Sequence, residues 1–140
     1  MNTHISSGAI VYKIENNVIK ILLLHRKDKN SWHLPKGTKN PDEMIEQTAI
    51  REVKEETGLN ITLGDYIGKL NSTYVRNNNE INKQTHYFLV KSFDGNLNIH
   101  DNEHDEVCFI EYPTAISYLE SFSLYEKEAE ILKKAKSHFV

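Results

Sequence analysis

The sequence has few of the residues that would point to a disulfide-stabilised, fibrous or disordered protein. Cys108 is the only cysteine among the 140 residues, which excludes a disulfide within the chain. Chains so poor in cysteine are typical of reducing compartments, so we expect a cytoplasmic protein. Glycine (six) and proline (three) are also scarce, and 39% of the residues are hydrophobic, which excludes a fibrous repeat and a disordered chain.

Long hydrophobic runs and an excess of basic residues are missing as well. No run approaches the roughly 18 apolar residues that span a bilayer, and the opening MNTHISSGAIVYK lacks the basic and apolar parts of a secretion signal. Lys and Arg number 17 against 20 Asp and Glu, a formal net charge of −3. Wholesale binding to nucleic acid or to an anionic membrane needs a basic face. We therefore expect no membrane partner and no stable nucleic-acid partner.

The chain is long enough for one folded unit, and we expect a single domain over residues 1–140. Runs of β-branched and aromatic residues predict strands at 5–14, 18–25, 61–74, 85–93 and 107–111, with a short strand around Trp32. The first two should form a hairpin, and the polar residues 76–82 should form an exposed loop. Cys108 falls within the last strand and is expected to be a buried small residue.

Apolar residues at intervals of three and four predict helices from about Pro41 to Thr57, over 113–119 and over 126–139. Asn40, Pro41 and Glu43 form a capping-box signature that places the start of the first helix near Pro41. Strands interleaved with two substantial helices indicate an α/β fold in which helices cover a mixed sheet.

The first predicted helix carries an unusual set of carboxylates. Glu52, Glu55 and Glu56 lie three and four residues apart, so they share one helix face. A solvated face is the ordinary explanation, but Arg51 and Lys54 are expected to point away and to leave the repulsion uncompensated. Oxygen ligands clustered in this way suit a hard divalent cation such as Mg²⁺, with Mn²⁺ as a substitute.

The spacing around this helix resembles the Nudix box. Gly37 is followed after five residues by Glu43, and after seven more by R-E-V-K-E-E-T-G-L at 51–59, so every defining position matches. The resemblance implies a Nudix-type α/β/α sandwich with a mixed central sheet. It also implies a metal-dependent hydrolase that cleaves a nucleoside diphosphate linked to another group.

Residue roles carry over from the box position by position. Glu52 and Glu56 are implied catalytic carboxylates, and Glu52 is a candidate to orient or deprotonate the attacking water. Glu43 and Arg51 look like the structural ion pair that steadies the loop against the helix. The implied metal ligands are the side chains of Glu52, Glu55 and Glu56 and the backbone carbonyl of Lys36.

Residues 32–37, WHLPKG, are similar to the W-x-x-P-K-G stretch of asymmetrically cleaving diadenosine tetraphosphate hydrolases, a branch of the Nudix family. That resemblance implies a dinucleoside polyphosphate substrate such as diadenosine tetraphosphate, with ATP and AMP as products. The residues implied in substrate binding are Lys36 and Lys83 at phosphate, Tyr74 and Tyr87 stacked on adenine, and His33 within the stretch.

Residues 102–105, NEHD, align with the histidine-glutamate-histidine segment of the same branch. Glu103 is therefore the implied remote carboxylate that assists metal binding or water activation, with Glu106 in reserve. The sequence departs from that branch at two positions. Asn102 replaces the first histidine of the segment, and Ser31 stands where animal members often carry histidine.

Several alternatives stay open from sequence alone. The substrate could instead be a nucleoside triphosphate, a nucleotide sugar or an RNA 5′ end, and either a monomer or a homodimer is compatible with the chain. A domain that senses nucleotide without cleaving it is disfavoured by the intact box. Zinc is disfavoured too, because His100 and His104 lack partner cysteines and no H-E-x-x-H occurs.

Overall fold

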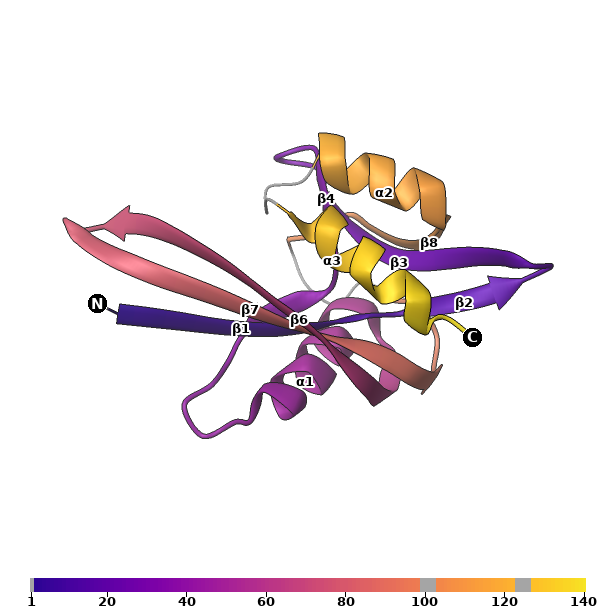
Figure 1. The fold of residues 1–140 in the computed structure, drawn as a ribbon, viewed down its shortest axis with the longest axis horizontal. Coiled ribbons are helices and arrows are strands. Elements are labelled where there is room, and N and C mark those ends of the chain that lie inside the picture. The colour runs from indigo at the N-terminus through magenta and orange to yellow at the C-terminus, as the bar shows by residue number, and fades with distance from the viewer. Residues whose placement is uncertain (1, 99–102, 123–126) are drawn as a thin grey trace.

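The computed structural model describes residues 2–98, 103–122 and 127–140, which form two β-sheets with helices on both sides (Figure 1). One sheet is mixed and has the strand order β5-β1-β7-β6, in which β1 and β7 run parallel. Its strands are β1 (Asn2–Ile10), β5 (Lys36–Thr38), β6 (Asn60–Arg76) and β7 (Asn79–Asp94). The other sheet is antiparallel, and β3 pairs there with each of the remaining strands. Its strands are β2 (Tyr12–Glu15), β3 (Val18–Arg26), β4 (Ser31–His33) and β8 (Glu106–Glu111).

Helices cover opposite sides of these sheets. Helix α1 (Ile45–Thr57) packs against β1, β6 and β7, whereas α2 (Tyr112–Ser121) packs against β3 and against α3 (Glu128–Ala135), as Figure 1 shows. A 3₁₀ turn, Lys136–His138, follows α3. Among the described residues, no helix is long and apolar enough to cross a membrane.

Strand β3 shows why this arrangement holds together. Its sequence VIKILLLHR contains an unbroken apolar run, because both of its faces are buried. Leu22 joins the hydrophobic cluster on the α1 side, whereas Ile21 and Leu23 join the larger cluster on the side of α2 and α3. The predicted α/β/α sandwich with a mixed sheet is therefore confirmed.

The single strand predicted over 5–14 is wrong. The strand is interrupted at the buried residue Val11. The part before it, β1, pairs with β7 in the mixed sheet, and the part after it, β2, pairs with β3 in the antiparallel sheet. The hydrophobic pattern shows no break because Ala9, Ile10 and Val11 are all completely buried. The predicted hairpin exists only between β2 and β3, where Asn16 and Asn17 form the turn with φ of 50° and 65°.

The loop predicted over 76–82 is also wrong. Strands β6 and β7 continue to Arg76 and from Asn79, and Asn77 and Asn78 alone form the turn, with φ of 52° and 64°. Asparagine tolerates this left-handed backbone, which two-residue hairpin turns require. These residues are polar because the strand ends are exposed, and together with β1 they form an arm that extends from the body (Figure 1).

The first helix begins later than predicted. Asn40 to Glu43 form a turn, in which the Asn40 amide donates to Glu43 Oε1 at 3.0 Å and the Glu43 amide donates to the Asn40 carbonyl at 3.0 Å. The helix starts at Ile45, where Gln47 Oε1 accepts the Met44 amide at 2.8 Å. The residues of the predicted capping box therefore form a turn before the helix instead of its first turn. The Glu43 carboxylate of that turn also binds Arg51.

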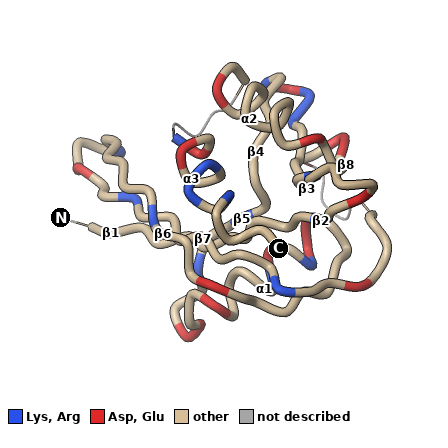
Figure 2. The backbone as a smooth tube through the Cα atoms, turned by 45° about the vertical axis from the view of Figure 1, so that its right-hand side comes forward, with Lys and Arg blue, Asp and Glu red and all other residues tan. Residues whose placement is uncertain are grey.

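The C-terminal predictions need smaller corrections. Helix α2 matches the segment predicted at 113–119, but α3 is shorter than the predicted 126–139, and position 126 lies outside the described residues. Cys108 is half-buried rather than buried, and its thiol faces the Glu106 carboxylate at 3.6 Å. Acidic and basic residues are interspersed along the part of the chain that the structure describes, as Figure 2 shows.

Candidate active site

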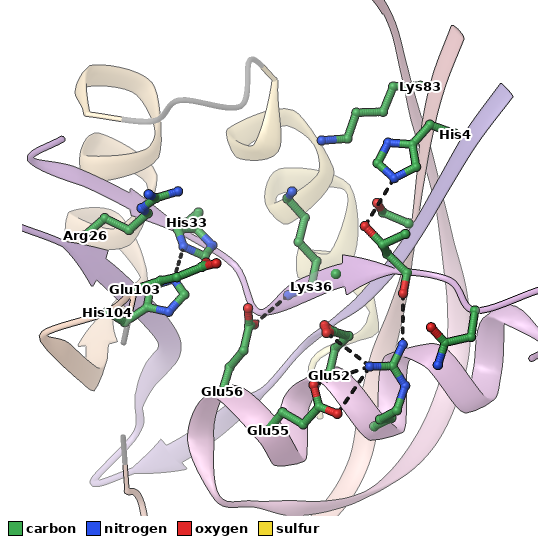
Figure 3. A pocket seen from close by; sticks show the side chains of 15 residues that line it. His4, Arg26, His33, Lys36, Glu52, Glu55, Glu56, Lys83, Glu103 and His104 are labelled. Atoms are coloured by element: carbon green, nitrogen blue, oxygen red, sulfur yellow. Dashed lines mark hydrogen bonds and ion pairs between the residues drawn. The ribbon is translucent and has the colours of Figure 1, made fainter. Parts of the chain in front are cut away.

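A cavity of about 480 Å³ lies between α1, the strands β1 and β7, and the segment around His104 (Figure 3). It brings together most of the residues predicted from the sequence, although they come from distant parts of the chain. Predicted residues that line it are His33, Lys36, Arg51, Glu52, Glu55, Glu56, Lys83 and Glu103. Lining residues to which the sequence assigned no role include His4, Arg26 and His104.

The acidic wall of the cavity comes from one face of α1. Glu56 is 9% exposed, the Glu52 side chain 13% and the Glu55 side chain 56%, so the three carboxylates range from buried to open. Gly37 leaves room for this wall, because a Cβ at that position would overlap the Glu52 carboxylate. Burial raises the pKa of Glu52, and Arg51 partly offsets that effect.

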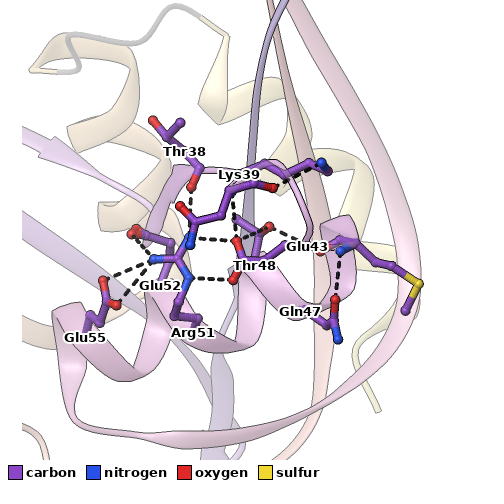
Figure 4. A network of polar contacts seen from close by, with 10 residues as sticks. Thr38, Lys39, Glu43, Gln47, Thr48, Arg51, Glu52 and Glu55 are labelled. Atoms are coloured by element: carbon purple, nitrogen blue, oxygen red, sulfur yellow. Dashed lines mark hydrogen bonds and ion pairs between the residues drawn. The ribbon is translucent and has the colours of Figure 1, made fainter.

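The structure places Glu43 and Arg51 in the predicted ion pair (Figure 4). Arg51 Nε donates to Glu43 Oε2 at 2.6 Å and Nη2 donates to Oε1 at 2.9 Å, which is the strong bidentate form of this contact. Arg51 Nη2 also donates to the Thr38 carbonyl at 2.9 Å, and Thr48 Oγ1 donates to Glu43 Oε1 at 3.0 Å. The loop before α1 is thus bound to the helix at several points.

Arg51 also corrects the expectation that the carboxylate repulsion is uncompensated. Its Nη1 lies 3.3 Å from Glu52 Oε1 and 3.3 Å from Glu55 Oε1. Glu55 lies four residues after Arg51, the spacing at which side chains on a helix meet, and the guanidinium also reaches the adjacent Glu52. A cation bound here would compete with Arg51 for the same carboxylate oxygens.

The opposite wall is basic. Lys36 is only 7% exposed, and burial lowers the pKa of its ammonium to about 8. The Lys36 amide donates to Glu56 Oε1 at 3.0 Å, which ties β5 directly to the acidic face of α1. Lys83 on β7 and His4 on β1 lie above Lys36, as Figure 3 shows. Cations and carboxylates therefore face each other across the cavity.

A buried pair of histidines occupies the other end of the cavity. His33 Nε2 and His104 Nε2 are 2.6 Å apart, and His33 Nδ1 donates to the Leu34 carbonyl at 2.8 Å. A carbonyl only accepts, so the His33 hydrogen is on Nδ1, and burial lowers the pKa of His33 to about 3. His33 is therefore neutral, and His104 donates from Nε2 to it.

Glu103 lies beside the two histidines and faces the cavity (Figure 3), whereas the reserve candidate Glu106 starts β8 and does not line it. Residues 100 and 102 lie outside the described residues. His104 is next to Glu103 and could have been selected from the sequence. Its contact with His33, 71 positions earlier, could not have been predicted.

The stacking role predicted for Tyr87 is wrong. Tyr87 is completely buried, and its hydroxyl donates to Glu128 Oε2 at 2.6 Å, so its ring offers no face to a base. Strand β7 is covered on both sides there, which the sequence pattern alone does not reveal. Tyr74 is 38% exposed on β6 but is not among the residues that line the cavity, so its stacking role stays a prediction.

The donor set of the acidic wall fits a hard divalent cation. Within the described ranges, no three Asp, Glu, His or Cys side chains are drawn together as a preformed metal cluster. Glu52, Glu55 and Glu56 nevertheless offer only carboxylate oxygens from one helix face, which are the ligands that Mg²⁺ prefers.

Comparison with known proteins places this geometry in context. A family model described as NUDIX domain matches residues 3–134. The chain is 33% identical over 115 residues to "Putative mutator protein MutT4" of Mycobacterium tuberculosis (strain CDC 1551 / Oshkosh), covering 80% of this chain and 46% of that protein. It is 30% identical over 114 residues to the CTP pyrophosphohydrolase of Escherichia coli (strain K12), covering 74% of this chain and 82% of that protein.

Solved structures share the fold. The crystal structure of a C. elegans Ap4A hydrolase binary complex superposes with a TM-score of 0.69 at 22% identity, covering 96% of each chain. At that identity the similarity shows the fold alone. The chain spans less than half the length of the first curated relatives that it matches.

Proposed function

The chain belongs to the Nudix family, and on that premise we propose that it is a divalent-metal-dependent hydrolase that cleaves a phosphoanhydride bond of a nucleoside polyphosphate. One observation carries the proposal: a carboxylate wall and a lysine wall face each other across one cavity. A polyphosphate needs both, since cations must bind its oxygens while a base and a metal act on the attacking water.

The position of each residue in the cavity indicates its proposed role. Lys36 and Lys83 bind the phosphate chain from the basic wall, and Glu103 faces them from the end of the cavity where His33 and His104 lie. Glu52 is largely shielded from solvent and lines the cavity, so it is the candidate to orient the attacking water or accept its proton. The chemistry that a metal supplies when bound is charge neutralisation on the phosphates and a lower pKa of water.

The metal ligands of this proposal are Glu52, Glu55 and Glu56, with the Lys36 carbonyl and Glu103 as further candidates. Glu56 would have a structural role besides metal binding, because its Oε1 already accepts a hydrogen bond from the Lys36 amide at 3.0 Å. Arg51 has a structural role as well, since it bridges Glu43 on one side and Glu52 and Glu55 on the other. Loss of that bridge would free the loop between β5 and α1.

Nucleoside triphosphates are the first substrate candidates. A mutator protein and a CTP pyrophosphohydrolase are among the relatives by sequence. The structure weakens one argument for a dinucleotide, because Tyr87 is buried and cannot stack on adenine. Hydrolysis would release a nucleoside monophosphate and pyrophosphate if the α–β anhydride bond is cleaved, or a nucleoside diphosphate and phosphate if the β–γ bond is cleaved.

Diadenosine tetraphosphate is the second candidate, and the WHLPKG stretch supports it. The stretch places His33 and Lys36 in the cavity wall, and Lys83 lies on the same wall. Attack near one end of the tetraphosphate would release ATP and AMP. A dinucleotide also requires space for a second nucleoside. A neighbouring cavity of about 680 Å³ shares Arg26, Glu103 and His104 with the first.

A nucleotide panel tests both candidates. Nucleoside triphosphates, an oxidised purine triphosphate, a nucleotide sugar and diadenosine tetraphosphate are each incubated with Mg²⁺, and the products are separated by chromatography. We expect turnover of a triphosphate or of the dinucleotide, and none with chelator present. Tight nucleotide binding without turnover of any compound would replace the hydrolase with a nucleotide-sensing domain.

A further inference from the structure

We propose that Glu128, a carboxylate buried behind the cavity, is a positioning residue that holds the ammonium groups of Lys36 and Lys83 together at the cavity wall. The proposal rests on the proposed function, since it assigns both lysines to the phosphate chain of the substrate. Glu128 itself does not line the cavity and is not part of the sequence motifs. Its position in the core therefore calls for a physical reason.

Glu128 is completely buried in the first turn of α3, and both of its carboxylate oxygens have partners. Oε2 accepts the Tyr87 hydroxyl at 2.6 Å, and Oε1 accepts the Leu34 amide at 3.3 Å. Tyr87 belongs to β7, the strand that carries Lys83, and Leu34 lies two residues before Lys36. Each hydrogen bond thus reaches a segment that carries one of the two lysines.

The electrostatic interactions of Glu128 involve the same two lysines. Burial raises the pKa of the Glu128 carboxylate, and the nearby positive charges of Lys36 and then Lys83 act against that rise. Lys36 is itself almost buried, and the negative charges of Glu128 and Glu56 raise the pKa of its ammonium, whereas the positive charge of Lys83 lowers it. Figure 3 shows the side chains of Lys36 and Lys83 directed to the same part of the cavity, below the start of α3. Two ammonium groups so placed repel, and the carboxylate behind them compensates that repulsion.

The backbone extends the effect to the acidic wall. The Leu34 amide is bound by Glu128 from α3, and the Lys36 amide is bound by Glu56 from α1. The three-residue segment 34–36 is thereby held between two carboxylates on opposite sides of the sheet. Glu128 consequently sets the position of both the Lys36 ammonium and the amide that orients Glu56.

Glu128→Gln tests the proposal because it keeps the size of the side chain and an oxygen that can accept a hydrogen bond, but removes the charge. We expect the Kd for inorganic tripolyphosphate, measured by calorimetry without added metal, to rise about tenfold. KM for the nucleotide should rise in parallel, with a smaller change in kcat. The exposed Glu130→Gln on the same helix serves as the control and should match the wild type.

The sign of the change separates positioning from simple electrostatics. Removing a carboxylate makes the site more positive, so an unchanged arrangement would bind tripolyphosphate more tightly. Tighter or unchanged binding by Glu128→Gln would overturn the proposal. Thermal unfolding is measured on the same samples, and a lower affinity without a lower Tm is the result that a purely structural role would not produce.

A double-mutant cycle checks that Glu128 acts through the lysines. In a Lys36→Met background, Glu128→Gln should change the tripolyphosphate Kd by clearly less than the roughly tenfold expected in the wild type, because only Lys83 remains to be positioned. Full additivity would overturn the proposal. Should Glu128→Gln fail to fold, Tyr87→Phe removes one hydrogen bond to the carboxylate and should weaken binding in the same direction.

The outcomes also separate this inference from the proposed function. If the wild type turns over no nucleotide, but tripolyphosphate binding still falls in Glu128→Gln, the hydrolase proposal fails and the positioning role stands. If the wild type turns over nucleotide and Glu128→Gln has the same KM, kcat and Kd, the positioning role fails alone.

Discussion

Glu56 shows at the scale of one residue how the site joins structure to chemistry, since it lines the cavity and accepts the Lys36 amide. Glu56→Gln preserves an acceptor for that amide but removes a negative charge from the proposed metal site. We expect kcat with Mg²⁺ to fall about 100-fold or more, with the fold unchanged. Steady-state kinetics measure the effect, and exposed Glu46→Gln on the same helix is the control. Wild-type turnover by Glu56→Gln would contradict the metal role.

The ion pair of Glu43 with Arg51 should make the stability of the folded protein depend on pH. The hydrogen bonds from Arg51 hold the pKa of Glu43 at about 2, below its ordinary value of 4.5. A folded-state pKa below the unfolded one means that the stabilisation is complete above pH 4.5 and is lost as the pH falls through about 2.

Denaturant unfolding of the wild type and of Glu43→Gln at a series of pH values measures this effect. The variant should be less stable near neutral pH, and the difference between the two proteins should shrink as the pH is lowered through that window. A difference that stays constant down to pH 2 would show that the ion pair does not contribute in this way. High salt should reduce the difference only partly, since the contact is bidentate.

The residues that could be predicted from sequence are those whose neighbours are close in the chain. Glu52, Glu55 and Glu56 share a face because helix geometry fixes their spacing, and the structure places all three at the cavity. The sequence could not show whether the Tyr87 ring is buried or available for stacking, because aromatic residues favour strands in both cases. The contact of His33 with His104 depends on how β4 and the segment before β8 meet, which no local pattern encodes.

At the scale of elements, the turn between β6 and β7 offers a test of the fold. Asn78 has φ of 64°, so a β-branched residue there would be strained. Asn78→Val should lower the free energy of unfolding by about 1 to 2 kcal/mol. Ser72→Val is the control, because Ser72 is exposed in an extended strand where valine is favoured. Equal stability of the two variants in chemical denaturation would contradict the assigned turn.

Element types were easier to predict than element limits. The existence of α1 and of both long strands followed from hydrophobic spacing, whereas the division of 5–14 into β1 and β2 did not. That division depends on which sheet each half joins, and the end of the first half is as buried as Val11 itself, since Ala9, Ile10 and Val11 are all completely buried. The turn at Asn77 and Asn78 was missed because exposed strand ends have the polar composition of a loop.

At the scale of the whole molecule, the proposed metal site predicts a ligand-dependent stability. A cation that binds only the folded protein stabilises it by about 2.7 kcal/mol at a concentration 100 times its Kd. We expect Mg²⁺ to raise Tm of the wild type, measured by calorimetry against a chelator-treated sample. The double variant Glu52→Gln with Glu56→Gln should show no such rise. An unchanged wild-type Tm would argue against the carboxylate wall as a cation site.

The parallel pairing of β1 with β7 has a consequence for how quickly the protein can become active. Residues 2–10 find their partners in β7 roughly eighty positions later in the chain, and β5 then pairs on the other edge of β1. Such non-local contacts form late, after helices and hairpins. The basic wall spans β1, β5 and β7, so on refolding the α-helical signal should recover before tripolyphosphate binding and the proposed nucleotide turnover do.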